Sequence, residues 1–409
     1  MNIYGYSIIG FIALVSLIEV AISVFGLRHM LEISKNLPEK ILSFYKEDQV
    51  LNALGYQREK TTINILERLV SITGFITLFY TGIITNYILW IESFTSMQLI
   101  SSLLLFISFG LFFFILELPF TVYNIFFIEK RFGFNKITPG LFIKDLVMNA
   151  GLLLLLLTVV LFIVVGLVQF LGDVWWIYSA IFIILLSLFM TYVYPSFIAP
   201  IFNSFKPLNN DVLNTKIKDL AEKIGFSLDN IYQMDASKRS THSNAYLTGF
   251  GKKKRIVLFD SLLSNHDEDE IVSILAHEFG HYKLGHIRKN LFASILLIFG
   301  CFYFAHALID ISFIYTALGL NESIFAGLFI IYILFSPLNF LISPIFLFLS
   351  RRYEYEADQF SVRLTDTPEI LKRALVKLHK DNLSNPIPDI LEVILYYSHP
   401  PLIDRVDAI

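Results

Sequence analysis

Two histidines four residues apart are the residues of this chain best suited to chemistry. His277, Glu278 and His281 form the pattern His-Glu-x-x-His, and the apolar residues before them recur with the spacing of a helix. Positions i and i+4 of a helix share one face, so both imidazoles can bind one zinc ion while the glutamate activates a water at that ion. The motif predicts a zinc-dependent hydrolase with Glu278 as its general base.

A catalytic zinc ion needs a third protein ligand and one open position for water. His286 follows His281 by five residues, about 140° further round a continuous helix, so it should point away from the other two histidines. Glu354 and Asp358 share a helical face at i and i+4. This spacing favours Glu354 as the third ligand, with Asp358 hydrogen-bonded to a ligating histidine. Glu356 is the alternative ligand, but it has no carboxylate four residues later.

The chain that must position these residues is far more apolar than a soluble enzyme. Of its 409 residues, 55% are hydrophobic and 16% are charged, against about 25% charged in ordinary soluble domains. The single cysteine, Cys301, leaves no internal disulfide and no cysteine-based metal site, so any metal must use histidine and carboxylate ligands. Apolar runs predict seven transmembrane helices, the first of them retained and not a cleaved signal peptide. The runs lie near residues 6–27, 69–90, 99–127, 148–171, 175–200, 290–312 and 324–350.

Lysine and arginine are distributed unevenly between these runs, and this sets the expected orientation. Six of them fall within residues 27–66 and four within residues 128–146. By the positive-inside rule these segments are cytoplasmic, and the same count places residues 201–289 and 351–409 in the cytoplasm and the N-terminus outside. The net charge of -3 gives no overall field that would attract nucleic acid. The expected partners are therefore the lipid bilayer and a peptide or protein substrate, and not nucleic acid.

The fold expected from these patterns is predominantly α-helical, with a small β-sheet in a cytoplasmic catalytic domain. Within that domain a helix should begin near Asp267, because its acidic start suits a helix N-terminus. Before it we expect a helix over residues 211–224, strands over 230–234, 244–250 and 255–259, and a turn that includes Lys252–Arg255. The chain should divide into transmembrane helices 1–5 (1–200), the metalloprotease domain (201–289), transmembrane helices 6 and 7 (290–350) and a C-terminal catalytic segment (351–409).

Several short motifs accompany the two zinc motifs. They are Glu129-Lys130-Arg131-Phe132-Gly133-Phe134-Asn135, Tyr194-Pro195, Pro200-Ile201-Phe202-Asn203, His242-Ser243-Asn244-Ala245-Tyr246, Ser398-His399-Pro400-Pro401 and Arg405. Taken together, these motifs resemble the zinc-dependent type I CAAX prenyl proteases, which are membrane-embedded gluzincins. The resemblance covers residues from about 30 to 405, with its elements in the order of the family.

The resemblance implies seven helices around an intramembrane chamber, one zinc ion, and Glu354 as the third ligand. It also implies that His399 and Arg405 are catalytic residues lining the site, and that Asn244 lies on the strand that holds the substrate backbone. In the implied mechanism Glu278 takes a proton from the attacking water and passes it to the leaving amine. Family members that act on CAAX proteins cut after the prenylated cysteine and release the last three residues.

The cellular setting and two other functions are further expectations. The Phe-, Ile-, Leu- and Asn-rich usage favours a bacterial relative in the inner membrane, with the active site facing the cytoplasm; a eukaryotic member would lie in the endoplasmic reticulum membrane. The alternatives are a quality-control metalloprotease for damaged membrane proteins and, in another class, a transporter or lipid-binding protein with a vestigial metal site. A complete set of ligands, general base and oxyanion candidate argues against the last.

Overall fold

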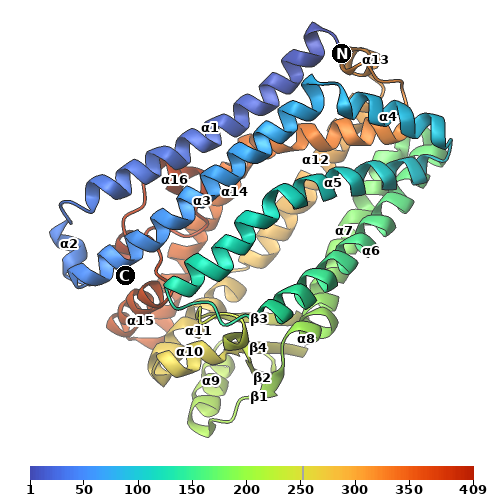
Figure 1. Cartoon of the computed structure of the whole chain (residues 1–409). Helices are drawn as coiled ribbons and strands as arrows, with labels where there is room; N and C mark the ends of the chain where they lie inside the picture. Colours follow the sequence, from blue (N-terminus) through green and yellow to red (C-terminus); the bar gives the residue numbers. More distant parts are fainter. Residues whose placement is uncertain (251–252) are drawn as a thin grey trace.

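The computed structural model describes residues 1–250 and 253–409, in which long helices form a bundle with a small mixed domain at one end (Figure 1). Gly251 and Lys252, in the expected turn, lie outside the described residues. The bundle contains α1 (Ile3–Ile33), α3 (Glu47–Tyr80), α4 (Ile83–Phe94), α5 (Gln98–Tyr123), α6 (Pro139–Leu171), α7 (Trp175–Val193), α12 (His286–Ile309) and α14 (Ile324–Thr365).

Six helical segments of the described residues are long and apolar enough to cross a membrane. One of them, Pro139–Phe202, contains both α6 and α7, which a single turn of 3₁₀ helix at Gly172–Val174 separates. The chain is therefore a multi-pass membrane protein, as expected, and the number of seven spans stays a prediction. The N-terminus lies beside α13 (Ser312–Leu318), where the backbone N–H of Asn2 donates to the carbonyl of Ala317 at 2.9 Å.

The second expected span, 69–90, is wrong as a single helix. The helix α3 begins at Glu47 and ends at Tyr80, and Gly82 adopts a φ of 74° before α4 starts. Only glycine takes this left-handed conformation at little cost, so Gly82 ends one helix and redirects the next. The first half of α3 carries several charged residues, which is why a search for apolar runs placed the span too late.

The mixed domain contains a four-stranded sheet with the order β1-β2-β4-β3. Its strands are β1 (Phe205–Pro207), β2 (Leu228–Met234), β3 (Ala245–Phe250) and β4 (Lys253–Phe259). The pair β2 and β4 is parallel, whereas β1 pairs with β2 and β3 pairs with β4 in antiparallel fashion. The strands β2, β3 and β4 were expected, and their ends differ from the expected ones by at most two residues. Neither β1 nor the parallel pairing of β2 with β4 was expected. The strand β3 forms one edge of the sheet.

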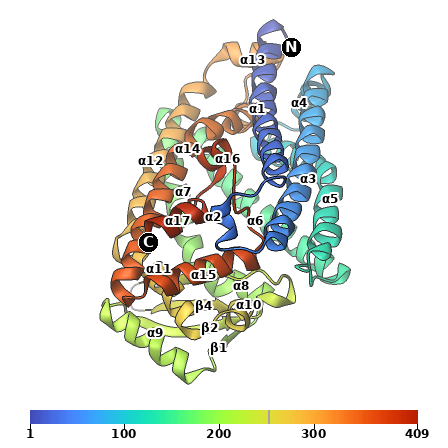
Figure 2. The ribbon, with the colours of Figure 1, turned by 90° about the vertical axis from the view of Figure 1, so that its left-hand side faces the viewer.

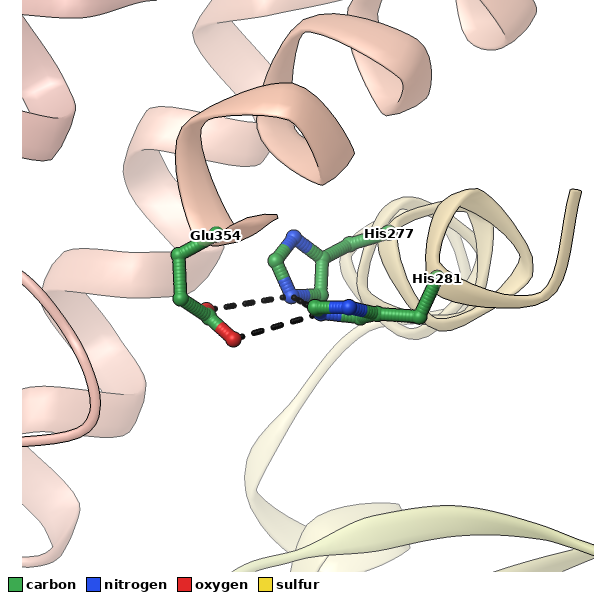
Figure 3. Close-up of side chains that lie close together, drawn as sticks. All are labelled: His277, His281 and Glu354. Carbon is green, nitrogen blue, oxygen red and sulfur yellow. Dashed lines mark hydrogen bonds and ion pairs between the residues drawn. The ribbon is translucent and has the colours of Figure 1, made fainter. Parts of the chain in front are cut away.

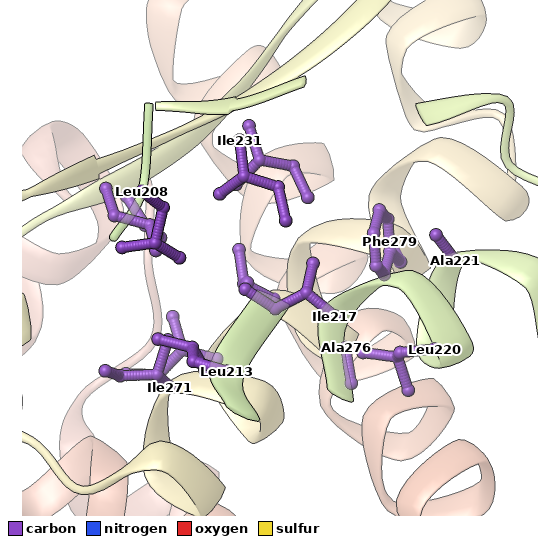
Figure 4. Packing of buried hydrophobic residues seen from close by; sticks show 14 of the residues in the cluster. Leu208, Leu213, Ile217, Leu220, Ala221, Ile231, Ile271, Ala276 and Phe279 are labelled. Carbon is purple, nitrogen blue, oxygen red and sulfur yellow. The ribbon is translucent and has the colours of Figure 1, made fainter. Parts of the chain in front are cut away.

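One face of this sheet is covered by α9 (Asp211–Lys223) and α11 (Glu268–Lys283). Leu213 and Ile217 of α9 share a face at i and i+4, and they meet Ile231 of β2 and Ile271 and Phe279 of α11 in one buried cluster (Figure 4). Each such side chain contributes about 1.5–3 kcal/mol when fully buried. This core fixes α11 on the sheet and so places the His-Glu-x-x-His motif.

The long helix α14 crosses the bundle and continues without a break into the mixed domain, where it packs against α11 (Figure 2). The two helices approach closely at Gly280, since a Cβ there would lie 3.0 Å from the Cα of Ala357. Ser361 also donates a hydrogen bond to the carbonyl of Ser273 at 2.9 Å. The expected boundary at residue 350 thus falls inside one helix. The remaining helices are α2 (Glu39–Leu42), α8 (Ala199–Phe202), α10 (Asp260–Asn265), α15 (Pro368–Asp381), α16 (Ile390–Tyr396) and α17 (Leu402–Ala408).

Candidate metal centre

The helix that carries the two histidines is anchored at its first turn. Asp267 accepts a hydrogen bond from the backbone N–H of Glu270 at 2.8 Å, and Glu270 accepts one from the N–H of Asp267 at 3.1 Å, which satisfies two free donors of the helix start. The Glu270 carboxylate is buried and also accepts from Arg373 at 2.8 Å and Lys377 at 3.0 Å, both on α15. The start of α11 is thereby fixed to α15, as expected for a helix beginning near Asp267.

Three side chains from two helices converge in the centre of the site (Figure 3). His277 and His281 project from one face of α11, and their Nε2 atoms lie 3.1 Å apart. The Glu354 carboxylate of α14 faces both, with Oε2 at 3.4 Å from His277 Nε2 and Oε1 at 3.2 Å from His281 Nε2. One donor atom from each residue lies within 4.8 Å of the other two. The structure thus brings together the three residues expected to bind metal.

The chemistry of these donors fits a metal ion. The Nδ1 atoms of both histidines are hydrogen-bonded elsewhere, so in the neutral tautomers that donate from Nδ1 the two lone pairs on Nε2 face each other. Oε2 of Glu354 is buried and has no hydrogen-bond partner among the described residues, although it forms an ion pair with Nη1 of Arg405 at 3.5 Å. Two imidazole lone pairs and a carboxylate in one small space repel one another unless a cation lies between them, and this donor set suits zinc.

His277 is held by a carboxylate that is itself clamped by an arginine. Asp358, on α14 one turn after Glu354, lies with Oδ1 at 2.8 Å from His277 Nδ1. Arg405 of α17 donates to both oxygens of Asp358, from Nε at 2.8 Å and from Nη2 at 2.6 Å, and all three side chains are buried. The Asp358 carboxylate can only accept a hydrogen bond, so Nδ1 of His277 carries the shared proton and a neutral ring keeps its lone pair on Nε2. We call His277, Asp358 and Arg405 the His277 support.

The partner of His281 is His286, which was expected from the sequence to point away from the other two histidines. Nδ1 of His281 lies 3.0 Å from Nδ1 of His286, and Nε2 of His286 lies 3.1 Å from Oε2 of Glu356. The expectation failed because α11 ends at Lys283, and Gly285, with a φ of 72°, redirects the chain before α12 begins at His286. Glu356, the alternative ligand, therefore bonds to His286. We call His281, His286 and Glu356 the His281 support.

Two further site residues border the three donors. Glu278 is half-buried on α11, and burial raises its pKa from the ordinary carboxyl value. His399, in the loop before α17, lies with Nε2 at 3.5 Å from Glu354 Oε1, and its side chain is 61% exposed. A cavity of about 450 Å³ reaches His399 and Arg405 from between α3, α15 and the C-terminal loop. The site therefore combines a buried metal-binding face with an open face.

Asn244 is the one expected site residue that stands outside this cluster. It immediately precedes β3, and its carbonyl accepts a hydrogen bond from the N–H of Phe259 on β4 at 3.1 Å. The strand β3 contacts α11, so the edge of the sheet runs beside the helix that carries the histidines. An edge strand offers free backbone N–H and C=O groups to an extended peptide.

The segment just before β3 is fixed by hydrogen bonds and an ion pair from residues to which the sequence patterns assigned no role. Glu129 accepts a hydrogen bond from Tyr56 at 2.6 Å and lies 3.5 Å from Nε2 of His242. Oδ1 of Asn382 lies 3.0 Å from Nδ1 of His242 and accepts from the N–H of Ser243 at 3.1 Å. The motifs that begin at Glu129 and His242 are thus in contact, which links the end of α5 to the edge strand.

Comparisons with known proteins cover both halves of the chain. Residues 207–409 match peptidase family M48, and residues 27–204 match the CAAX prenyl protease N-terminal family, described as five membrane helices. A mouse CAAX prenyl protease 1 homolog is 32% identical over 93% of this chain and 90% of its own length, and an Arabidopsis thaliana homolog is 40% identical over 72% and 70%. The crystal structure of S. mikatae Ste24p is similar with a TM-score of 0.90 and 27% identity over 97% of each chain.

These matches cover nearly all of the chain, and the donors of the candidate metal centre lie within the peptidase part. The family shown by these matches is therefore a protease family, and not that of the transporter or lipid-binding protein considered as an alternative. The chain belongs to peptidase family M48 and to the CAAX prenyl proteases within it, and it is a membrane metalloprotease.

Proposed function

We propose that this chain is a zinc endopeptidase that removes the C-terminal tripeptide after a prenylated cysteine. The observation that carries the proposal is the convergence of His277, His281 and Glu354 beside Glu278 and the edge strand β3. The relatives named above are CAAX prenyl proteases, which supports the substrate class. In this reading the three donors hold one zinc ion, and no covalent acyl-enzyme forms.

The proposed chemistry divides between the residues of the open and buried faces. A zinc ion at this site supplies a Lewis acid that polarises the scissile carbonyl and the attacking water. Glu278, whose pKa burial raises, takes the proton of the water and gives it to the leaving amine. His399 donates a hydrogen bond to the developing oxyanion from the exposed side. Arg405 bonds to both oxygens of Asp358 and lies with Nη1 at 3.5 Å from Oε2 of Glu354. We therefore assign it a role in positioning Glu354 directly and His277 through Asp358.

The substrate backbone is proposed to add to the sheet beside β3. An extended peptide would then run along α11, and Asn244 at the start of β3 would bond to one end of it. We place the mixed domain at the cytoplasmic face, because the lysine- and arginine-rich segments 27–66 and 128–146 lie on that side by the positive-inside rule. The membrane is the inner membrane in a bacterium or the endoplasmic reticulum membrane in a eukaryote.

Replacing the proposed general base tests the mechanism. Glu278→Gln keeps the shape of the side chain but cannot take a proton, so zinc content should equal that of the parent protein while tripeptide release from a farnesylated peptide falls by at least about 10²–10⁴-fold. Mass spectrometry of the released tripeptide measures the rate. Glu369→Gln is the matched control, because the Glu369 side chain is 83% exposed and pairs with Lys372, outside the candidate metal centre. Undiminished cleavage by Glu278→Gln would reject the mechanism.

The substrate class needs a separate comparison. The purified protein should cleave a farnesylated peptide and leave the same peptide with a free cysteine intact. Equal cleavage of both, or preferential cleavage of a misfolded membrane protein, would replace the CAAX proposal by the quality-control alternative while leaving the metalloprotease mechanism in place.

A further inference from the structure

His286 lies at the centre of a continuous line of hydrogen-bonding groups that starts at a proposed zinc ligand. The line runs from His281 Nδ1 to His286 Nδ1 over 3.0 Å and from His286 Nε2 to Glu356 Oε2 over 3.1 Å. His286 is 1% exposed, and its ring stacks on Tyr353 with 4.3 Å between centroids and 13° between planes. The ring is therefore fixed in position and orientation by packing as well as by hydrogen bonds.

The identity of the outer group decides where each proton lies. A carboxylate only accepts hydrogen bonds, so Nε2 of His286 must carry the proton that it shares with Glu356. A neutral His286 then has its lone pair on Nδ1, and it accepts the Nδ1–H of His281. His281 is left with its lone pair on Nε2, which is the atom that faces His277 and Glu354. Each step fixes one tautomer, and the last one is the metal-binding form.

The local backbone is built for this contact. Gly285 has a φ of 72°, so α11 and α12 are separate helices and the first residue of α12 turns back toward His281. Glu356 and Tyr353 both lie on α14, in the same two turns as Glu354. The line thus joins three helices at the site, of which α12 and α14 are apolar enough to cross the membrane.

We propose that His286, fixed by Glu356, is a positioning residue that holds His281 in its metal-binding tautomer. The inference rests on the proposed function, because it assumes that His281 is a zinc ligand. It adds a role for a histidine that lies outside the His-Glu-x-x-His motif and for a glutamate that is not a ligand. Groups that hydrogen-bond to ligating histidines typically change metal affinity 10–100-fold when removed.

The test measures metal retention, independently of cleavage. The variants are His286→Leu, which removes the acceptor, and His286→Asn, whose side-chain carbonyl can accept the Nδ1–H of His281. We expect His286→Leu to lower zinc affinity about 10–100-fold in competition with a chelator, and His286→Asn to recover most of it. Glu356→Ala tests the outer end of the line without disturbing the core, because the Glu356 side chain is 35% exposed. This variant should also lower zinc affinity. His29→Leu, on α1, is the matched control and should equal the parent protein.

The outcomes separate the inference from the proposed function. Unchanged zinc affinity in both His286→Leu and Glu356→Ala overturns the positioning role. Equal losses in His286→Leu and His286→Asn, with none in Glu356→Ala, show that the ring contributes packing alone and also overturn it. A parent protein that binds zinc but fails to cleave prenylated peptides defeats the proposed function and leaves the positioning role standing, whereas a parent that binds no zinc defeats the assumption common to both.

Discussion

The supports of the two histidines differ in charge and in burial. In the His277 support a buried carboxylate bonds directly to the ring, and a buried arginine bonds to that carboxylate at two points. In the His281 support a neutral ring stands between the histidine and a carboxylate that is 35% exposed. The His277 support contains an ion pair in a low-dielectric interior, where removing one partner is costly. The His281 support ends at a carboxylate that contacts solvent, where the loss of one partner costs less. The same ligand type is thus positioned by charge in one case and by tautomer in the other.

The largest expected effect comes from breaking the His277 support. Asp358→Ala leaves Arg405 buried without its bidentate partner, which costs about 3–5 kcal/mol of unfolding free energy. Zinc affinity should also fall, and further than in His286→Leu. Thermal unfolding in detergent and chelator competition measure the two quantities. A smaller loss in Asp358→Ala than in His286→Leu would reverse the comparison.

A change at the start of α11 should weaken both supports together and should depend on pH. Burial alone raises the pKa of Glu270, but hydrogen bonds from Lys377 and Arg373 outweigh it and hold the pKa below its ordinary value of 4.5. The stabilisation is therefore complete above pH 4.5 and is lost as the pH falls through the lowered pKa. Glu270→Gln should cost about 1.5–3 kcal/mol at pH 7 and progressively less in acid.

The difference between the melting temperatures of the parent and Glu270→Gln at several pH values checks this sign. A difference that grows as the pH falls would contradict it. His266, whose ring lies 3.2 Å from Glu270, is the neighbouring group whose substitution must be compared in the same series.

Separating α11 from α14 is the next test, because both supports cross between these helices. Gly280→Ala places a Cβ 3.0 Å from the Cα of Ala357, and backbone cannot move aside as a flexible side chain can. We expect the free energy of unfolding to fall by about 1–3 kcal/mol. Zinc affinity should fall as well, because both supports are displaced. Gly110→Ala is a matched control, since a Cβ there meets nothing within 4 Å. Equal behaviour of the two variants would show that the close approach at Gly280 is unimportant.

The smallest effect is expected at the outer end of the His281 support. Arg352 pairs with Glu356 at 3.3 Å one helical turn away, and its side chain is 69% exposed. Such a pair contributes about 0.3–0.5 kcal/mol. Arg352→Gln should therefore change neither the melting temperature nor zinc retention measurably. A loss comparable to that of Glu356→Ala would mean that the exposed ion pair, and not the hydrogen bond to His286, positions Glu356.

Sequence patterns predicted the convergence of the three donors better than the contacts that hold them, for a physical reason. His277 and His281 lie on one helix and Glu354 and Asp358 on another, so helical periodicity brings each pair to one face before any tertiary contact is known. The contact between His281 and His286 depends on one backbone dihedral at Gly285, which a periodic pattern cannot express. Gly285, four residues after His281 and just before a membrane run, was the available signal, because glycine there favours a helix end.

The fold shows the same division between local and distant information. Apolar runs located the membrane helices, but the charged first half of α3 was missed because its buried residues, such as Val50, Leu54 and Tyr56, are interspersed with polar residues and are covered by tertiary contacts. The strands β2, β3 and β4 follow from local patterning, whereas the three-residue β1 and the parallel pairing of β2 with β4 depend on tertiary contacts. The cavity of about 690 Å³ between α1, α3, α5 and α14 likewise arises from side chains of distant segments.

The unbroken helix α14 sets the height at which chemistry can occur. The helical path of its 42 residues is about 63 Å long, roughly twice the thickness of the hydrocarbon core of a bilayer, and Pro337 and Pro344 lie within it. Glu354 is part of this continuous helix, so its distance from the membrane changes only if the helix tilts or bends. If the proposed function holds, we expect the site to select peptide bonds by their depth: a substrate anchored in lipid presents its bond at a height fixed by its own anchor, and a bond held higher or lower would not reach Glu354 and the two histidines.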